Sequence, residues 1–80
     1  MSKYAPLRDY LLRQKHREFE LTFKEIEAIV GFKLPVSADR PQWWANQKAA
    51  GRAQREAWRA AKYDAFLIRG SDRVRFLRVA

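Results

Sequence analysis

Residues 22–31 carry the strongest structural signal in this chain, because they specify both ends of one short helix. Thr22 and Glu25 have the spacing of a capping box, in which each side chain accepts a hydrogen bond from the other residue's backbone N–H. Gly31 stands where a helix-ending residue with a positive φ angle belongs. We predict a helix over residues 23–30. Its apolar side chains are Phe23, Ile26, Ile29 and Val30, and Ile26 and Ile29 should face the core, as should Trp58 further along the chain.

The flanking patterns predict the other elements and their order. Pro6 suits the first turn of a helix, and residues 18–22 alternate polar and apolar as a half-buried strand does. Asp39 is suited to cap a short helix that carries Trp43 and Trp44. The full predicted order is a helix from Pro6 to about residue 15, a strand over 18–22, the capped helix, the short Trp43–Trp44 helix, an Ala- and Arg-rich helix over 52–63, and strands over 66–69 and 73–77.

This order is that of a winged helix, a helix-turn-helix variant with a terminal hairpin. We therefore expect an α+β fold, a small winged-helix-like domain with three or more helices and a short three-stranded antiparallel sheet. The connector over residues 31–40 is long for the tight turn of that motif, and a generic α+β domain with a small sheet fits the same order. Eighty residues leave room for a single domain over residues 1–80.

The composition requires an aromatic core. No cysteine is present to form a disulfide or a thiolate metal site, whereas 48% of the residues are hydrophobic and 14% aromatic. No apolar run approaches a membrane span, and the N-terminal residues lack the apolar stretch of a signal peptide, so we expect a soluble, cytoplasmic protein. A thin core gives a reason to form a homodimer. The candidate interface residues are Trp43, Trp44, Leu77 and Val79.

The uneven distribution of charge predicts a class of partner. The net charge is +8, and residues 41–80 hold nine Lys or Arg against three acids. Clustered cations attract polyanions and accelerate encounters with them. On the predicted helix over residues 52–63 the cations are spaced three, four and three, with alanines on the other side. We expect this helix to present a basic outer face to DNA, although a merely solvated face has the same pattern.

The terminal hairpin adds cations to this predicted surface. Arg73 and Arg75 share one strand face, and Arg69 precedes the turn. A basic hairpin beside a basic helix is suited to straddle the DNA backbone, while charges on an exposed edge strand also discourage aggregation, and both interpretations remain open. The candidate DNA-binding residues are Lys48, Arg52, Arg55, Arg59, Lys62, Arg69, Arg73 and Arg75.

Little in the sequence points to catalysis. His16 is the only histidine, and neither cysteine nor clustered acids accompany it as metal ligands or catalytic partners. Ser37 and Ser71 stand in turn-like contexts without an activating base. Trp43 and Trp44 differ by about 100° around a helix, so we expect at least one in the core. The other is expected at a rim, capping the packing of the 52–63 helix, or stacked on a ligand or partner. We expect no metal, no cofactor and no enzymatic activity.

Four blocks of the sequence resemble a family of small, largely uncharacterised bacterial and phage domains. They are residues 4–11 (Tyr-Ala-Pro-Leu-Arg-Asp-Tyr-Leu), 21–27 (Leu-Thr-Phe-Lys-Glu-Ile-Glu), 31–35 (Gly-Phe-Lys-Leu-Pro) and 43–46 (Trp-Trp-Ala-Asn), followed by an Ala- and Arg-rich helix with Trp58. The family carries no functional assignment for individual residues. The chain also resembles anti-CRISPR proteins, a resemblance that implies action against a type I system.

The leading hypothesis is therefore a non-enzymatic protein that binds double-stranded DNA largely without sequence preference, through the basic helix and hairpin. Its implied use is anti-defence by a phage or mobile element, through occupation of DNA or of the DNA path of a CRISPR effector complex. A small transcriptional regulator is the alternative within DNA binding. The alternative of another class is a protein-binding inhibitor that docks on an acidic patch of a CRISPR effector.

Overall fold

The computed structural model describes residues 3–44 and 53–79. Three helices and three strands appear there in the predicted order, together with two short 3₁₀ turns between the second and third helices. The elements are α1 (Ala5–Leu12), β1 (Glu18–Thr22), α2 (Phe23–Val30), η1 (Val36–Asp39), η2 (Pro41–Trp44), α3 (Ala53–Ala60), β2 (Tyr63–Leu67) and β3 (Arg73–Arg78).

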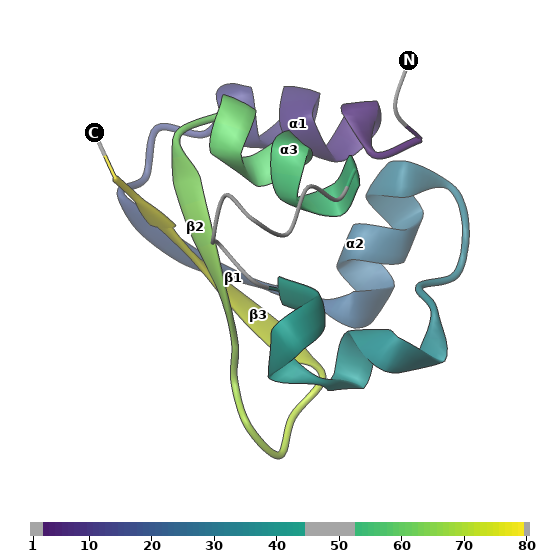
Figure 1. The fold of residues 1–80 in the computed structure, drawn as a ribbon. Coiled ribbons are helices and arrows are strands. Elements are labelled where there is room, and N and C mark those ends of the chain that lie inside the picture. The colour runs from purple at the N-terminus through teal and green to yellow at the C-terminus, as the bar shows by residue number, and fades with distance from the viewer. Residues whose placement is uncertain (1–2, 45–52, 80) are drawn as a thin grey trace.

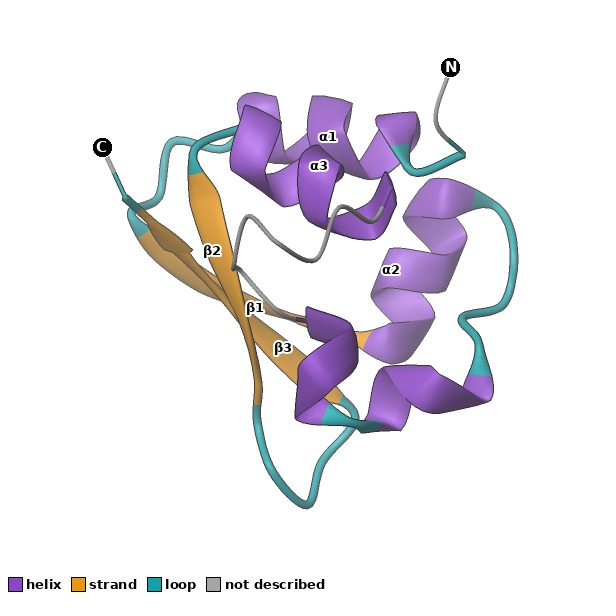
Figure 2. Cartoon of the chain, viewed as in Figure 1, coloured by secondary structure: helices purple, strands orange, loops and turns teal. Residues whose placement is uncertain are grey.

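The three strands form one antiparallel sheet in the order β1-β3-β2. The last strand therefore lies in the middle, between the strand that precedes α2 and the strand that follows α3. All three helices lie on the same side of the sheet (Figure 1). Figure 2 shows that the hairpin loop between β2 and β3 projects beyond the helices. This is the predicted small α+β domain, with the element order of a winged helix and an open sheet.

The capping box predicted from the sequence is present in full. The Glu25 backbone N–H donates to the Thr22 hydroxyl at 3.1 Å, and the Thr22 backbone N–H donates to the Glu25 carboxylate at 2.8 Å. The pKa of Glu25 lies below its ordinary value, chiefly because the Thr22 backbone N–H donates to its carboxylate and secondly because the Thr22 hydroxyl does. Gly31 ends the helix with φ +85°, a conformation that a side chain disfavours. The helix has the predicted bounds because its own residues satisfy both of its ends.

A layer of aromatic rings fills the space between the sheet and the helices. Both Trp43 and Trp44 are buried, so the expectation of at least one core ring is confirmed, whereas a rim position for the other is wrong. Trp44 stacks on Trp58 with ring centres 5.4 Å apart, and its Nε1 donates to the Ala38 carbonyl at 2.7 Å. Trp43 contacts Trp44 edge to face at 4.6 Å. The 3₁₀ turn η2, tighter than the predicted α-helix, directs both rings inward.

The predicted core residues of α2 and α3 are confirmed for the most part. Ile26 and Trp58 are fully buried, whereas Ile29 packs against the core from a partly exposed position. Tyr63 and Phe76 are buried on the inner face of the sheet, and both rings contact the ring of Phe19 on β1. A single connected core therefore joins all the described helices and strands.

The C-terminal half departs from the prediction in its element bounds. The helix predicted to reach residue 63 ends at Ala60, and the strand predicted from residue 66 already begins at Tyr63. Lys62 separates them with a φ of +65°, a left-handed conformation that no helix continues through. Tyr63 and Ala65 alternate inward against β3. Cross-strand pairing and burial here override the helix propensity of the preceding alanines.

Candidate nucleic-acid interface

The described part of α3 does not carry the basic outer stripe that its sequence predicts. Arg55 is buried, with a side chain only 10% exposed, and its guanidinium donates to Glu56 at 2.9 Å. Arg59 forms an ion pair with Asp64 of β2. The inward face of α3 consists of Gln54, Arg55, Ala57 and Trp58, while Ala53 and Ala60 are exposed. The predicted outward projection of Arg55 is therefore wrong, because burial of Trp58 turns the neighbouring Arg55 inward with it.

Of the other residues predicted on this helix, Lys62 belongs to the turn before β2. Lys48 and Arg52 lie outside the described residues. Residues 53–60 hold two cations and one acid, and Asp64 of β2 pairs with the second cation, so the described part of α3 is close to electrically neutral. A nearly neutral surface gives phosphates little reason to bind there.

The cations of the hairpin are exposed but paired with acids of β1. Arg75 lies 3.2 Å from Glu18 and 3.5 Å from Glu20, and Arg73 lies 3.8 Å from Glu20. The register explains the pairs, since Arg75 is directly opposite Glu20 across the β1–β3 pairing. Arg69 is the exception, since it is exposed at the hairpin loop and forms no ion pair with any described residue.

Three other segments meet at the opposite end of the sheet, where the α1–β1 loop, the α3–β2 turn and the end of β3 come together (Figure 1). The Arg78 backbone N–H donates to the Arg17 carbonyl at 2.7 Å, and the Val79 backbone N–H donates to the Lys62 carbonyl at 2.9 Å. The buried Tyr63 hydroxyl donates to the His16 carbonyl at 2.6 Å. These bonds fix the three segments against one another.

Five cations gather at this end, which we call the basic end and define as Arg13, Lys15, Arg17, Lys62 and Arg78. The first four are exposed, and none of the five forms an ion pair within residues 3–44 and 53–79. His16 is exposed in the same loop. Because the cations come from three separate segments, their summed potential is a property of the fold and not of one sequence run.

Arg78 holds the basic end together. Its Nη2 donates to the Gln14 carbonyl at 2.8 Å and lies 3.2 Å from the Tyr63 hydroxyl, and its guanidinium lies 5.3 Å from the centre of the Tyr63 ring. Its Nε is buried without a hydrogen-bond partner among the described residues. Beside it a hollow of about 430 Å³ is lined by Leu12, Ala60, Ala61, Lys62 and Arg78. Two of the five cations, Lys62 and Arg78, therefore line a concave part of the basic end.

The sequence contained a signal for this surface that our prediction did not use. Residues 13–17 read Arg-Gln-Lys-His-Arg, with three cations and no acid. The prediction concentrated on the longer basic stretch after residue 52, where acids are also few. The decisive information is spatial, because the acids that neutralise Arg73 and Arg75 come from β1, far away in the sequence.

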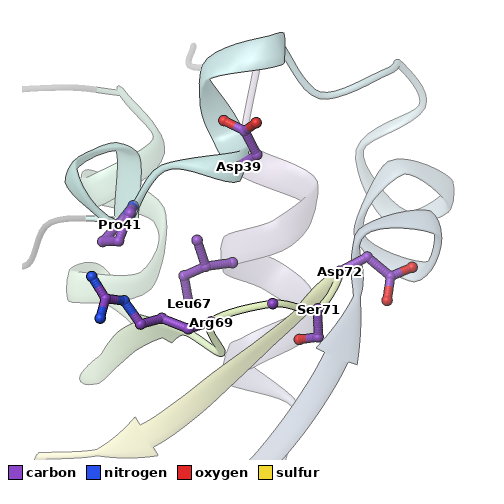
Figure 3. A pocket seen from close by; sticks show the side chains of 7 residues that line it. Asp39, Pro41, Leu67, Arg69, Ser71 and Asp72 are labelled. Carbon is purple, nitrogen blue, oxygen red and sulfur yellow. The ribbon is translucent and has the colours of Figure 1, made fainter.

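A wider hollow of about 630 Å³ lies at the other end of the molecule, between the 3₁₀ turns and the hairpin loop. Figure 3 shows that Arg69 extends toward Pro41 on one side of this hollow, whereas the Asp72 carboxylate points to the other side. The Ser71 hydroxyl donates to the Ile68 carbonyl and accepts from the Arg73 backbone N–H. Its hydrogen bonds thus belong to the hairpin turn. Asp39 and Asp72 make this hollow mixed in charge and less attractive to a polyanion than the basic end.

In residues 3–44 and 53–79, no group of three or more His, Cys, Asp or Glu side chains is placed to hold a metal ion. None of the described helices is long and apolar enough to cross a membrane.

The Lys3 ammonium lies over the rings of Tyr4 and Phe32, 5.6 and 5.2 Å from their centres, so this cation has an aromatic environment.

Comparison with known proteins supplies a family but no activity. The sequence matches no curated protein and no solved structure. A family model, described as a domain of unknown function (DUF7662), matches residues 4–80, which include every described helix and strand. Nearly the whole chain is thus accounted for by one family, and the protein belongs to the DUF7662 family of small domains.

Proposed function

We propose that this protein binds double-stranded DNA without catalysis and largely without sequence preference, and that the basic end is the contact surface. The observation that carries the proposal is the convergence of four exposed cations without ion pairs, from two segments, around the anchored Arg78. Exposed cations that no acid neutralises are free to replace the counterions of DNA phosphates, which is the main source of nonspecific affinity.

The shape of the basic end supports contact with the phosphate backbone more than with base edges. The cations stand on a loop, a turn and a strand end, and no helix of the described residues projects them as a unit into a groove. Phosphate contacts set position and affinity, whereas base contacts specify sequence. We therefore expect similar affinities for unrelated duplexes. Arg69 at the far hairpin loop provides at most an additional contact on a long duplex.

The biological setting that we propose comes from the resemblance to anti-CRISPR proteins and is a second, separable proposal. A phage or mobile-element protein with a free basic surface is suited to occupy DNA, or the DNA path of a type I effector complex. An acidic patch on such an effector would attract the same cations, so a protein-binding inhibitor is the alternative. A plasmid-interference assay with a type I system tests this setting, and unchanged interference in the presence of the protein would exclude it.

The binding proposal is tested by a salt titration with fluorescently labelled duplexes of two unrelated sequences. If each of the five basic-end cations contacts one phosphate, the logarithm of the association constant should fall against the logarithm of salt concentration with a slope of about −4.5, at about −0.9 per phosphate. The two duplexes should give similar curves. Absence of binding to either duplex at about 50 mM salt would remove the DNA proposal and favour docking on an acidic protein.

A further inference from the structure

The outer face of the sheet differs from the rest of the surface in both charge and polarity. Alternation along the strands places the buried Tyr63, Ala65, Val74 and Phe76 toward the helices. The opposite face consists of Glu18, Glu20 and Thr22 from β1, Asp64 and Phe66 from β2, and Arg73, Arg75 and Leu77 from β3. All the described helices lie on the inner side, so nothing among the described elements covers this face (Figure 2).

Large apolar side chains are exposed on this face. Phe66 is 45% exposed and Leu77 36%, and Val79 just beyond β3 is 46% exposed. Phe66 and Leu77 border a hollow of about 480 Å³, whose lining residues are Glu18, Phe66, Leu67, Ile68, Arg75 and Leu77. Grouped exposed apolar side chains beside a hollow are typical of a contact surface, whereas single ones are ordinary.

Charge decides which partner fits. The outer face carries three acids, Glu18, Glu20 and Asp64, against the two cations Arg73 and Arg75, and each of the five takes part in an ion pair. The chain as a whole has a net charge of +8. Two copies of so basic a chain repel each other at most orientations, but contact through this nearly neutral face keeps their unpaired cations apart. A polyanion, in contrast, gains nothing here.

We propose that the outer face of the sheet binds the same face of a second copy of this chain, with each Phe66 entering the hollow of the other copy. A two-fold arrangement requires a self-complementary surface, and a side chain beside a hollow supplies one. In such a pair the basic end of each copy remains accessible, because it lies at one end of the sheet and not on the outer face. The pairing is independent of whether they bind DNA.

The size of the sheet sets the strength of the association. Three strands of five or six residues cover about 17 by 14 Å, from about 3.3 Å per residue and 4.8 Å between strands. Even with the neighbouring loops, the total buried area stays at or below the roughly 1,200 Å² that characterises weak complexes. We therefore expect a dimer that forms at tens of micromolar, with dissociation constants of about 10–100 μM.

The dependence of dimerisation on salt concentration distinguishes it from DNA binding. Raising the ionic strength from about 0.05 to 0.5 M shortens the Debye length several-fold and screens the repulsion between two chains of charge +8. Dimerisation should therefore strengthen with salt, whereas DNA binding should weaken. Because the two responses have opposite signs, failure of one proposal is distinguishable from failure of the other.

Sedimentation equilibrium of the full chain tests the proposal. The wild type should show a mass rising from monomer toward dimer between about 5 and 200 μM, more so at high salt. Phe66→Glu and Leu77→Glu place like charges in the hollow and should each leave a monomer with an unchanged circular dichroism spectrum. Val36→Glu is the matched control, since Val36 is 90% exposed on η1, away from the sheet.

A wild type that remains monomeric at about 200 μM in high salt would overturn the proposal. So would a dimer that survives both sheet substitutions, because its interface would then lie elsewhere. Equal loss of dimer in Val36→Glu and Phe66→Glu would also contradict it, since general apolar exposure and not this face would drive association.

Discussion

The hairpin and the basic end hold cations of the same kind, but their surroundings differ. Arg73 and Arg75 extend from β3 toward Glu18 and Glu20 of β1, within 3.2 to 3.8 Å. At the opposite end of the sheet, the cations of the α1–β1 loop and the α3–β2 turn form no ion pair with any described residue. The number of Arg and Lys in a segment therefore does not measure the potential that a ligand experiences. This potential also depends on the acids that the fold places beside those cations.

The largest effect expected from this comparison is loss of DNA binding after charge reversal at the basic end. Replacement of Arg13, Lys15 and Arg17 by Glu should weaken binding on the order of 100-fold or more at low salt, since three phosphate contacts become repulsions. All three residues are exposed, so the thermal transition should move little. Fluorescence anisotropy and a melting curve measure the two quantities.

The matched control reverses Arg73 and Arg75, which are also exposed but form ion pairs. We expect a reduction in affinity of less than about tenfold, with the loss of surface ion pairs costing under about 1 kcal/mol each. Equal losses from the two sets would indicate a diffuse attraction with no localised surface.

The second prediction tests whether ion pairing keeps the hairpin arginines from binding DNA. Replacement of Glu18 and Glu20 together by Gln removes the partners of Arg73 and Arg75 while keeping side chains of similar size. The freed cations should raise DNA affinity about 3- to 10-fold and steepen the salt slope by about one to two units. Unchanged affinity and slope would mean that the ion pairs are not the reason why the hairpin contributes little to DNA binding.

A smaller effect is expected from the hydroxyl that anchors the basic end. Tyr63→Phe removes the donor to the His16 carbonyl and the group beside the Arg78 guanidinium. The free energy of unfolding should fall by about 1 kcal/mol, because a partly buried hydrogen bond is lost. DNA affinity should fall only a few-fold, since the cations remain. Chemical denaturation detects the first effect, and a stability equal to wild type would show that this hydrogen bond does not anchor the loop.

The smallest effect on binding is expected at the capping box, which lies outside both regions. Thr22→Ala should cost about 1 kcal/mol of stability and leave DNA affinity unchanged. Hydrogen bonds from Thr22 hold the pKa of Glu25 below its ordinary value of 4.5 in the folded chain. This contribution to stability is thus present above pH 4.5 and is lost as the pH falls through the lower folded value.

Glu25→Gln separates that contribution from general acid denaturation. The advantage of the wild type over this variant in urea unfolding should be largest near neutral pH and should shrink with acidification below about pH 4.5. A difference that stays constant with pH would contradict the role of the carboxylate in the cap.

The parts of the fold that could be predicted from sequence are those specified by local chemistry. The bounds of α2 follow from its own capping box and Gly31, and the alternation in residues 18–22 and 73–77 gives β1 and β3 nearly to the residue. The end of α3 could not be predicted, because Tyr63 and Ala65 read as a continuing helix until β3 is beside them.

The candidate surface was harder to predict for the same reason. Helical spacing placed Arg55 outside, but burial of Trp58 in the aromatic layer fixed the rotation of α3 and turned Arg55 inward. The ion pairs of Arg59 and Arg75 join different elements, so no local pattern reveals them. Ion pairs between different elements determine which cations stay unpaired, and a local sequence pattern does not reveal those pairs.

The most direct test of the account is an NMR titration of the ¹⁵N-labelled protein with a short unlabelled duplex at low salt. We predict that the largest amide shifts fall on residues 13–17, 62 and 78–79, which the structure joins into one end of the sheet. The amides of residues 53–60 and 73–75 should change little. Largest shifts in the hairpin and α3, with the basic end unaffected, would contradict the claim that unpaired cations determine where this protein meets DNA.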